Sequence, residues 1–141
     1  MSAGCSGTPL AKKLSLKAGQ RVWFDGMPGS VRSEIAPEEV GLILLAAPEA
    51  PIDVAHVFVA ERARLEEAIG RLLPLLAPTG FLWVSWPKKA SKVPTDITED
   101  VIRAVALPTG LVDVKVCAVD DIWSGLKLMI RKDRREASRT G

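Results

Sequence analysis

The chain has 141 residues, of which 48% are hydrophobic, and a formal net charge of +2 at pH 7. This size and composition fit one domain with one apolar core. Residues 131–141 carry a net charge of +3, which leaves −1 for the rest of the chain. Because duplex-binding domains usually carry a basic face across the fold, nucleic acid is not an expected partner.

Both ends of the chain are predicted to lie outside the folded domain. Residues 1–7 are rich in Gly and Ser and residues 133–141 form a basic tail, so we expect both to be disordered, around a domain at 8–132. The N-terminal sequence lacks the apolar core of a signal peptide, and no apolar run is long enough to span a bilayer. The expected location is the cytoplasm, without membrane contact.

The first half of the chain alternates short helices and strands. Thr8 and Pro9 are typical of a helix start. A continuous apolar run before Pro48 predicts a strand that is covered on both faces. The predicted elements are a helix over Pro9–Leu14, a strand over Arg21–Asp25, a short helix over Ser30–Ile35 and a buried strand over Gly41–Ala47.

The second half contains the strongest helix signal. After Glu61 the apolar residues recur at helical spacing, at Leu65, Ala68, Ile69, Leu72, Leu73 and Leu76. Pro74 is expected to kink or end the last turn, and Ala77–Gly80 is expected to form a tight turn. Asp96 is the expected cap of a later helix, with Glu99 completing a capping box. Four strands are predicted, over Val54–Val59, Phe81–Trp86, Leu111–Val119 and Trp123–Ile130.

Alternating strands and helices indicate a mostly parallel sheet with right-handed crossovers, to which a final hairpin adds an antiparallel strand. The second half, over residues 54–132, resembles the end of a class I methyltransferase fold. That resemblance implies a single Rossmann-like three-layer α/β domain. Its six-stranded sheet would have the order 2-1-3-4-6-5, with the last strand antiparallel and helices on both faces.

The chain also resembles an uncharacterised bacterial family, the domain-of-unknown-function family numbered 3052. The resemblance spans nearly the whole chain and brings no assigned activity with it. It rests on the segments SGTPLAKKL at Ser6–Leu14, GQRV at Gly19–Val22, HVFV at His56–Val59, WVSWPKK at Trp83–Lys89, TDITEDV at Thr95–Val101 and VDDIWSGLK at Val119–Lys127.

The methyltransferase resemblance implies a cofactor site at the turn after the first strand, with Asp25, Gly26 and Gly29 as candidate S-adenosylmethionine contacts. The turn departs from the expected pattern, because it holds two glycines and Pro28 lacks a backbone N–H. The second strand should end in an acidic residue for the ribose, yet Glu49 follows only after a proline. The chain is also about one strand–helix unit short. We therefore expect no cofactor, with S-adenosylmethionine as the alternative.

A cationic loop follows the strand that ends at Trp86. Lys88, Lys89 and Lys92 lie at a carboxyl strand end and next to a helix start, where an anion would be favoured. The simpler interpretation is that these lysines pair with Asp120 and Asp121 in the turn of the final hairpin. Asp96 would also compete with an anion for the helix start.

Aromatic residues flank the same edge. Trp86 and Trp123 can form a stacking wall or a partner contact, or they can simply cover the end of the sheet. Trp23 and Trp83 are expected in the core. Of these alternatives, packing is the expected role of Trp86 and Trp123.

No catalytic or metal-binding pattern accompanies these residues. His56 lies among valines, as a hydrogen-bonded core histidine would, and Ser85 lacks the glycines of a nucleophile elbow. One histidine and two distant cysteines give no metal-ligand spacing.

The favoured hypothesis is a non-catalytic binding module. A partner protein or an anionic small molecule would bind at the edge formed by residues 86–92 and 120–123. The alternative is a degenerate S-adenosylmethionine-dependent methyltransferase-like enzyme. The oligomeric state is left open.

Overall fold

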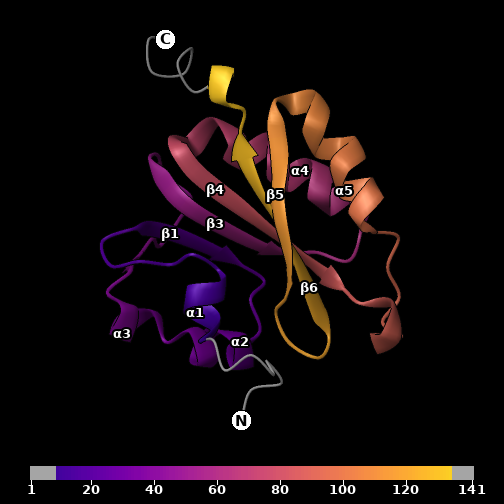
Figure 1. The fold of residues 1–141 in the computed structure, drawn as a ribbon, viewed down its shortest axis with the longest axis horizontal. Coiled ribbons are helices and arrows are strands. Elements are labelled where there is room, and N and C mark those ends of the chain that lie inside the picture. Colours follow the sequence, from indigo (N-terminus) through magenta and orange to yellow (C-terminus); the bar gives the residue numbers. More distant parts are fainter. Residues whose placement is uncertain (1–8, 135–141) are drawn as a thin grey trace.

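The computed structural model describes residues 9–134. The predictions for residues 1–7 and for Thr8 lie outside these residues. Of the predicted disordered tail 133–141, only Asp133 and Arg134 are described, and both lie in a short helical turn after the last strand. Figure 1 shows a central sheet between two groups of helices. The helices are α1 (Leu10–Lys13), α2 (Gly29–Ile35), α3 (Pro37–Val40), α4 (Arg62–Leu72) and α5 (Glu99–Ala106), and the strands are β1 (Arg21–Asp25), β2 (Ile43–Leu44), β3 (Ile52–Phe58), β4 (Leu76–Pro87), β5 (Leu111–Ala118) and β6 (Trp123–Ile130).

The sheet has the order β2-β1-β3-β4-β6-β5, which confirms the predicted topology. β1 pairs in parallel with β2 and with β3, and β3 pairs in parallel with β4. β6 runs antiparallel to both of its neighbours, β4 and β5. Parallel crossovers followed by one hairpin are therefore the architecture that the sequence pattern indicated.

Two apolar cores lie on opposite faces of the sheet, which makes the domain three-layered. α4 and α5 cover one face, and α4 contributes the stripe Leu65, Ala68, Ile69 and Leu72. The other core contains Leu10 and Leu14 from the α1 region and Val31 and Ile35 from α2. The two helix groups lie on different sides of the strands in Figure 1. Within the described residues, no helix is long and apolar enough to cross a membrane.

The prediction of a buried strand over Gly41–Ala47 is wrong. Only Ile43 and Leu44 form a strand, β2, and their relative exposures are 48% and 38%. β2 is an edge strand that pairs with β1 alone, over two residues. An apolar run of this length can be covered on both faces only where strands and helices flank it, and an edge position lacks that cover.

The predicted turn over Ala77–Gly80 is part of strand β4. α4 ends at Leu72, a 3-10 turn containing Pro74 follows, and β4 begins at Leu76. The register slips here, because Ile52 pairs with Leu76 while Val54 pairs with Phe81. A Cβ atom on Gly80 would lie 2.7 Å from the Ile52 carbonyl oxygen, so a glycine is needed at this close approach.

The predicted capping residue of α5 is also corrected. Thr98 is the N-cap, and its hydroxyl accepts a hydrogen bond from the Val101 amide at 3.2 Å. The Asp96 carboxylate instead accepts from the Arg62 amide at 2.7 Å, at the start of α4. Thr95 adds a hydroxyl hydrogen bond to the Ala60 carbonyl at 2.6 Å. The loop before α5 is therefore fastened to the junction between β3 and α4.

Candidate ligand-binding site

A cleft of about 420 Å³ opens at the carboxyl ends of β1 and β3, and we call it the β1–β3 cleft. Carboxyl strand ends are the common ligand position in open α/β sheets. The junction after β3 and one face of α4 form its walls. Its lining residues are Trp23, Asp25, Gly26, Phe58, Val59, Ala60, Glu61, Arg64, Glu67, Ala68, Arg71, Leu72 and Pro94.

The turn after β1 places two of the three predicted cofactor-contact residues in this cleft. Asp25 and Gly26 line it, and Gly29 is the first residue of α2. Gly26 has φ +70°, and a Cβ there would approach the Phe58 carbonyl oxygen at 3.2 Å. Glycine is therefore required for the chain to turn this close to β3. Pro28 takes the N-cap position of α2, without an N–H to offer.

Charges of both signs face the β1–β3 cleft from α4. Arg64, Glu67 and Arg71 follow one another at spacings of three and four residues, which places them on one helix face. Arg64 approaches Glu61 at 3.9 Å. Among the described residues, Arg71 and Asp25 have no ion-pair partner. Both are exposed and free to meet a ligand.

A buried donor also lies at the β1–β3 cleft. Trp23 was expected in the core, and it does pack against the α4–α5 core while also lining the cleft. Its indole N–H is buried without an acceptor in the described part of the chain. An unsatisfied buried donor is costly, and because this nitrogen is sealed from solvent, a ligand in the cleft would reach it only if neighbouring side chains moved. Sequence reasoning missed this residue because its aromatic character indicated packing alone.

Glu49, the acidic residue after β2, lies at the wrong edge of the sheet for a ribose. Its carboxylate approaches the Arg21 guanidinium at 3.8 Å, and Arg21 is the first residue of β1. The Arg21 side chain also donates to the Pro51 carbonyl at 2.7 Å, which anchors it at the amino end of the sheet. The β1–β3 cleft is lined by both acidic and basic side chains. It does not supply the expected ribose carboxylate.

The three lysines predicted to bind an anion lie at the end of β4, and the expected pairing with the aspartates is absent. Within residues 9–134 the ion pairs include none between Lys88, Lys89 or Lys92 and Asp120 or Asp121. The two segments are instead joined through the backbone.

That backbone junction involves the tip of the β5–β6 hairpin. The Lys88 amide donates to the Ile122 carbonyl at 2.7 Å. The Asp120 carboxylate accepts from the amides of Ile122 and Trp123, both at 2.8 Å. Asp120 therefore stabilises the tight turn, which accounts for an acidic residue at this position without a lysine partner.

Trp86 and Trp123 do not form a common wall. Trp86 is 7% exposed and belongs to the α4–α5 core. Trp123 packs with the opposite core and makes an edge contact with Phe58, with ring centroids 5.1 Å apart. In the β4–β6 ladder Trp86 lies opposite Ser124, one position out of step with Trp123. The alternating pleat therefore sends the two indoles to different faces of the sheet.

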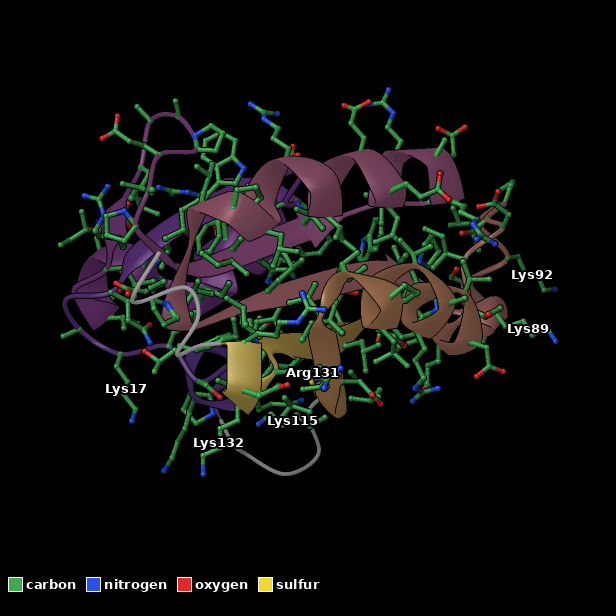
Figure 2. The ribbon with its side chains drawn as sticks, turned by 90° about the horizontal axis from the view of Figure 1, so that it is seen from above. Lys17, Lys89, Lys92, Lys115, Arg131 and Lys132 are labelled. Atoms are coloured by element: carbon green, nitrogen blue, oxygen red, sulfur yellow. The ribbon has the colours of Figure 1, made fainter. Side chains whose placement is uncertain are left out.

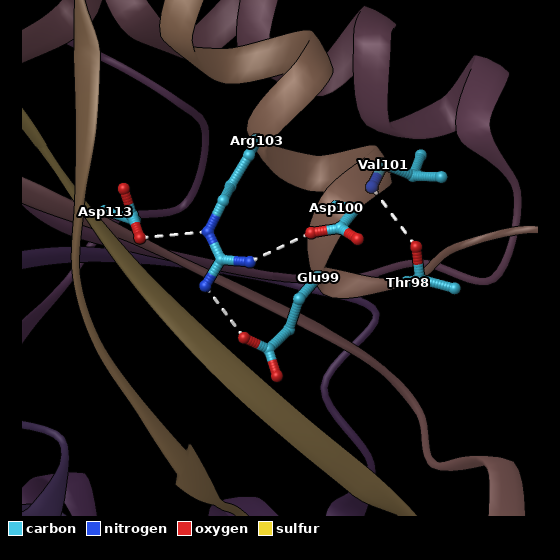
Figure 3. Close-up of polar contacts among 6 residues, drawn as sticks. All are labelled: Thr98, Glu99, Asp100, Val101, Arg103 and Asp113. Atoms are coloured by element: carbon cyan, nitrogen blue, oxygen red, sulfur yellow. Dashed lines mark hydrogen bonds and ion pairs between the residues drawn. The ribbon is translucent and has the colours of Figure 1, made fainter.

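A second cleft, of about 460 Å³, lies between the end of β4 and the start of α5, where Trp86 and Lys89 meet acidic residues. Arg103 binds Glu99 at 2.8 Å, Asp100 at 3.2 Å and Asp113 at 3.0 Å, as Figure 3 shows.

This three-carboxylate network has an electrostatic signature. The hydrogen bond that Arg103 donates lowers the pKa of Asp113, and the hydrogen bonds that Arg103 donates to Asp113 and Glu99 raise the pKa of Arg103. All three nitrogens of the guanidinium are engaged, so the group fastens α5 to β5. The spacing of Glu99 and Arg103, i and i+4, signals part of this network in the sequence.

His56 is a buried, hydrogen-bonded histidine, as expected. Its Nε2 lies 2.7 Å from the Ser85 hydroxyl, and the two residues are 1% and 0% exposed. The ring stacks on Phe58 with centroids 4.5 Å apart. Burial lowers the pKa of His56 to about 3. Although Ser85 is a nucleophile by residue type, a pair sealed this fully cannot meet a substrate.

Metal ligation has no support in the described residues, where no group of three or more His, Cys, Asp or Glu side chains is placed to hold an ion. No family model matches the chain, and no curated protein matches it.

Solved structures with a similar fold include methyltransferases. One is the ribosomal protein L11 methylase from Lactobacillus delbrueckii subsp. bulgaricus, with a TM-score of 0.56 and 10% identity over 86% of this chain and 75% of that one. A second is an S-adenosylmethionine-dependent methyltransferase from Aquifex aeolicus, with a TM-score of 0.55 and 18% identity over 85% and 89%.

A third is fibrillarin from Aeropyrum pernix, whose structure holds natively bound S-adenosyl-L-methionine. It has a TM-score of 0.52 and 10% identity over 86% of this chain and 69% of that one. At these identities the similarity defines a fold. The described residues form a six-stranded α/β fold of the Rossmann-like kind seen in these methyltransferases.

Proposed function

We propose that this protein is a small-molecule-binding module, and that its ligand occupies the β1–β3 cleft and carries both a positive and a negative charge. The observation that carries the proposal is that two side chains of opposite charge, Asp25 and Arg71, line the same cleft. Neither has an ion-pair partner among the described residues. Convergent polar groups in a concave site at strand ends are typical of ligand sites.

S-adenosylmethionine is the first ligand to test, because it carries positive ammonium and sulfonium groups and a negative carboxylate, and because a solved structure of similar fold holds it natively bound. Asp25 and Gly26 would contact it from the turn after β1. The bound cofactor would supply a transferable methyl group. We assign no transfer step, because Pro28 lacks an N–H and Glu49 binds Arg21 at the other edge. Binding without catalysis is the proposal, and a degenerate methyltransferase is the alternative.

The test is an amide-shift titration of the labelled protein by NMR. The ligands are S-adenosylmethionine, methionine and adenosine. Saturable shifts at Asp25, Gly26 and Ala60 are expected with S-adenosylmethionine and, at higher concentration, with methionine, which has both charges but no nucleoside. Shifts with adenosine alone, or with none of the three at millimolar concentration, would refute a charge-selecting cleft.

Paired variants of α4 sharpen this experiment. Arg71→Glu reverses a charge that lines the cleft, while Arg62→Glu reverses one on the same helix that does not line it. Arg71→Glu should weaken binding by about tenfold or more, the scale of one lost charge-assisted hydrogen bond. Arg62→Glu should leave the affinity within about twofold.

A second candidate is the binding of an anionic partner at Lys88, Lys89 and Lys92. It is favoured by the finding that no ion pair within residues 9–134 involves these lysines. The double variant Lys88→Glu and Lys89→Glu should abolish capture of such a partner without changing the thermal midpoint. Retained binding would remove this edge from consideration.

We also propose that the chain belongs to the uncharacterised family numbered 3052 and that the protein is cytoplasmic. The six resembling segments between Ser6 and Lys127 support the family assignment. The cytoplasmic location is checked by fractionating cells that produce the tagged protein.

A further inference from the structure

Four lysines converge on the face of the sheet opposite α4 and α5. Lys13 and Lys17 come from α1 and the turn after it, Lys115 from β5 and Lys127 from β6. We call this set the lysine patch. Lys115 lies directly opposite Lys127 in the β5–β6 ladder. The Lys127 ammonium donates to the Ser15 hydroxyl at 3.1 Å, which joins the hairpin to the segment after α1.

The lysine patch holds its charges in fixed positions in spite of their repulsion. The Lys127 ammonium lies 4.2 Å from the centroid of the Phe81 ring, so a cation–π contact and the hydrogen bond to Ser15 both restrain it. Burial lowers the pKa of Lys127, and the charges of Lys115 and Lys17 lower it further. Burial raises the pKa of the Cys117 thiol on β5, whereas the charges of Lys13 and Lys115 lower it. Like charges directly opposite each other in a sheet are destabilising.

A register shift removes the nearest carboxylate from the lysine patch. Asp113 and Lys115 are two residues apart and would share a face in a regular strand. The register shifts between them, so that Asp113 lies opposite Leu128 and Lys115 opposite Lys127. Asp113 consequently faces the α5 side, where Arg103 binds it at 3.0 Å. The shift segregates the charges, and the described ion pairs leave all four lysines without an acidic partner.

The basic charge continues beyond the lysine patch. In Figure 2 the side chains of Lys17, Lys115 and Lys132 project to one side of the molecule, whereas Lys89 and Lys92 project from another end. Arg131 follows the end of β6; its amide donates to the Gly110 carbonyl, and its guanidinium binds the Asp133 carboxylate at 3.1 Å. From Lys127 to Arg131 an extended strand spans roughly 13 Å, at about 3.3 Å per residue. Cations spread over this distance suit a chain of phosphates better than one phosphate.

We propose that the lysine patch binds the phosphate backbone of single-stranded nucleic acid without reading its sequence. The net charge of the chain hides this feature, because acidic residues on the other surfaces balance the patch. Backbone contacts by lysines neutralise phosphates and release counterions, so affinity falls steeply with salt. With four phosphates neutralised, the affinity should fall about 50-fold between 50 and 200 mM salt. This surface lies on the other face of the sheet from α4 and is independent of the β1–β3 cleft.

The test is fluorescence anisotropy of the full chain with a labelled 20-nucleotide oligodeoxythymidine. Two variants with equal net charge are compared: K17E/K115E in the lysine patch and K89E/K92E at the end of β4. K17E/K115E should weaken binding at least tenfold and flatten the salt dependence. K89E/K92E should stay within about twofold of the native protein, because exposed charges at that distance are largely screened.

Three results would overturn the proposal. The first is no anisotropy change at 50 mM salt with the protein at 100 μM. The second is equal weakening by both double variants, since net charge alone would then explain binding. The third is displacement of the oligonucleotide by poly-glutamate at equal charge concentration, which would identify an acidic protein segment as the occupant. If K17E/K115E does not fold, judged by its thermal midpoint, Lys115→Gln alone should still weaken binding at least threefold.

Discussion

Lowering the pH should destabilise this protein through a single buried histidine. His56 is 1% exposed, bound to the Ser85 hydroxyl and stacked on Phe58. Burial holds its folded-state pKa at about 3, against 6.5 in the unfolded chain. Below pH 6.5 the unfolded chain therefore takes up a proton that the folded protein refuses until about pH 3. Stability is lost as the pH falls through this window, because protonation favours the unfolded state.

The size of the loss follows from the two pKa values. Each pH unit within the window costs about 1.4 kcal/mol. At pH 5 the penalty from His56 is therefore about 2 kcal/mol, a large part of the stability of a domain of this size. The matched variant is His56→Gln, which keeps a hydrogen-bonding group for Ser85 and does not titrate. At pH 7 it should be less stable than the native protein, because the ring contact with Phe58 is lost.

The assay is urea unfolding followed by tryptophan fluorescence at pH 7, 6 and 5, with Trp83 fully buried as a core reporter. Carboxylates elsewhere titrate in both proteins and cancel in the comparison. Between pH 7 and 5 the variant should lose about 2 kcal/mol less stability than the native protein. Equal losses in the two proteins would mean that His56 titrates normally in the fold, and the burial argument would fail.

Three further substitutions test the local structure by the same unfolding assay. Thr98→Ala should cost about 1 kcal/mol because Val101 loses its cap, and Thr98→Ser should restore it; an unchanged value would refute the assigned cap. Gly80→Ala should cost about 1–3 kcal/mol, because its Cβ would meet the Ile52 carbonyl at 2.7 Å; a neutral result would mean that β4 can move away. Lys115→Gln should raise stability by a few tenths of a kcal/mol by removing repulsion from Lys127, and a loss would show that the lysine has a structural role.

The strand–helix alternation was sufficient to predict a mostly parallel sheet with a final hairpin, and the resemblance of residues 54–132 to a methyltransferase fold supplied the strand order. The sequence was insufficient to predict how far each strand is covered by neighbouring elements. The run around Ile43 and Leu44 has the composition of a central strand. Its place at the edge depends on which neighbours follow it in space, and a local pattern does not contain that information.

Local rules also failed where two distant segments compete for one polar group. Asp96 and Glu99 have the spacing of a capping box, yet the Asp96 carboxylate reaches the start of α4 and Thr98 caps α5. The shift of register between Asp113 and Lys115 is equally invisible in an alternating pattern. The shift leaves Asp113 in contact with Arg103 of α5 and Lys115 opposite Lys127.

The candidate sites were predicted unevenly for the same reason. Residues 25 and 26 could be placed at a strand end, and the structure puts both in the β1–β3 cleft. Arg64 and Arg71 were visible as polar positions of an amphipathic helix. The sequence could not show that this face of α4 lines the β1–β3 cleft, because that depends on how α4 packs on the sheet. The two aspartates of the hairpin turn were assigned to the lysines by proximity, whereas Asp120 bonds its own turn.

The fastening of the loop before α5 has a mechanical consequence. Thr95 and Asp96 bind Ala60 and Arg62, and Pro94 beside them forms part of the wall of the β1–β3 cleft. The segment that carries Lys92 therefore cannot swing outward without releasing both the cleft wall and the first turn of α4. A ligand bound in the β1–β3 cleft should therefore slow amide hydrogen exchange in the loop before α5. Binding in the cleft would in this way also restrict the motion of Lys92.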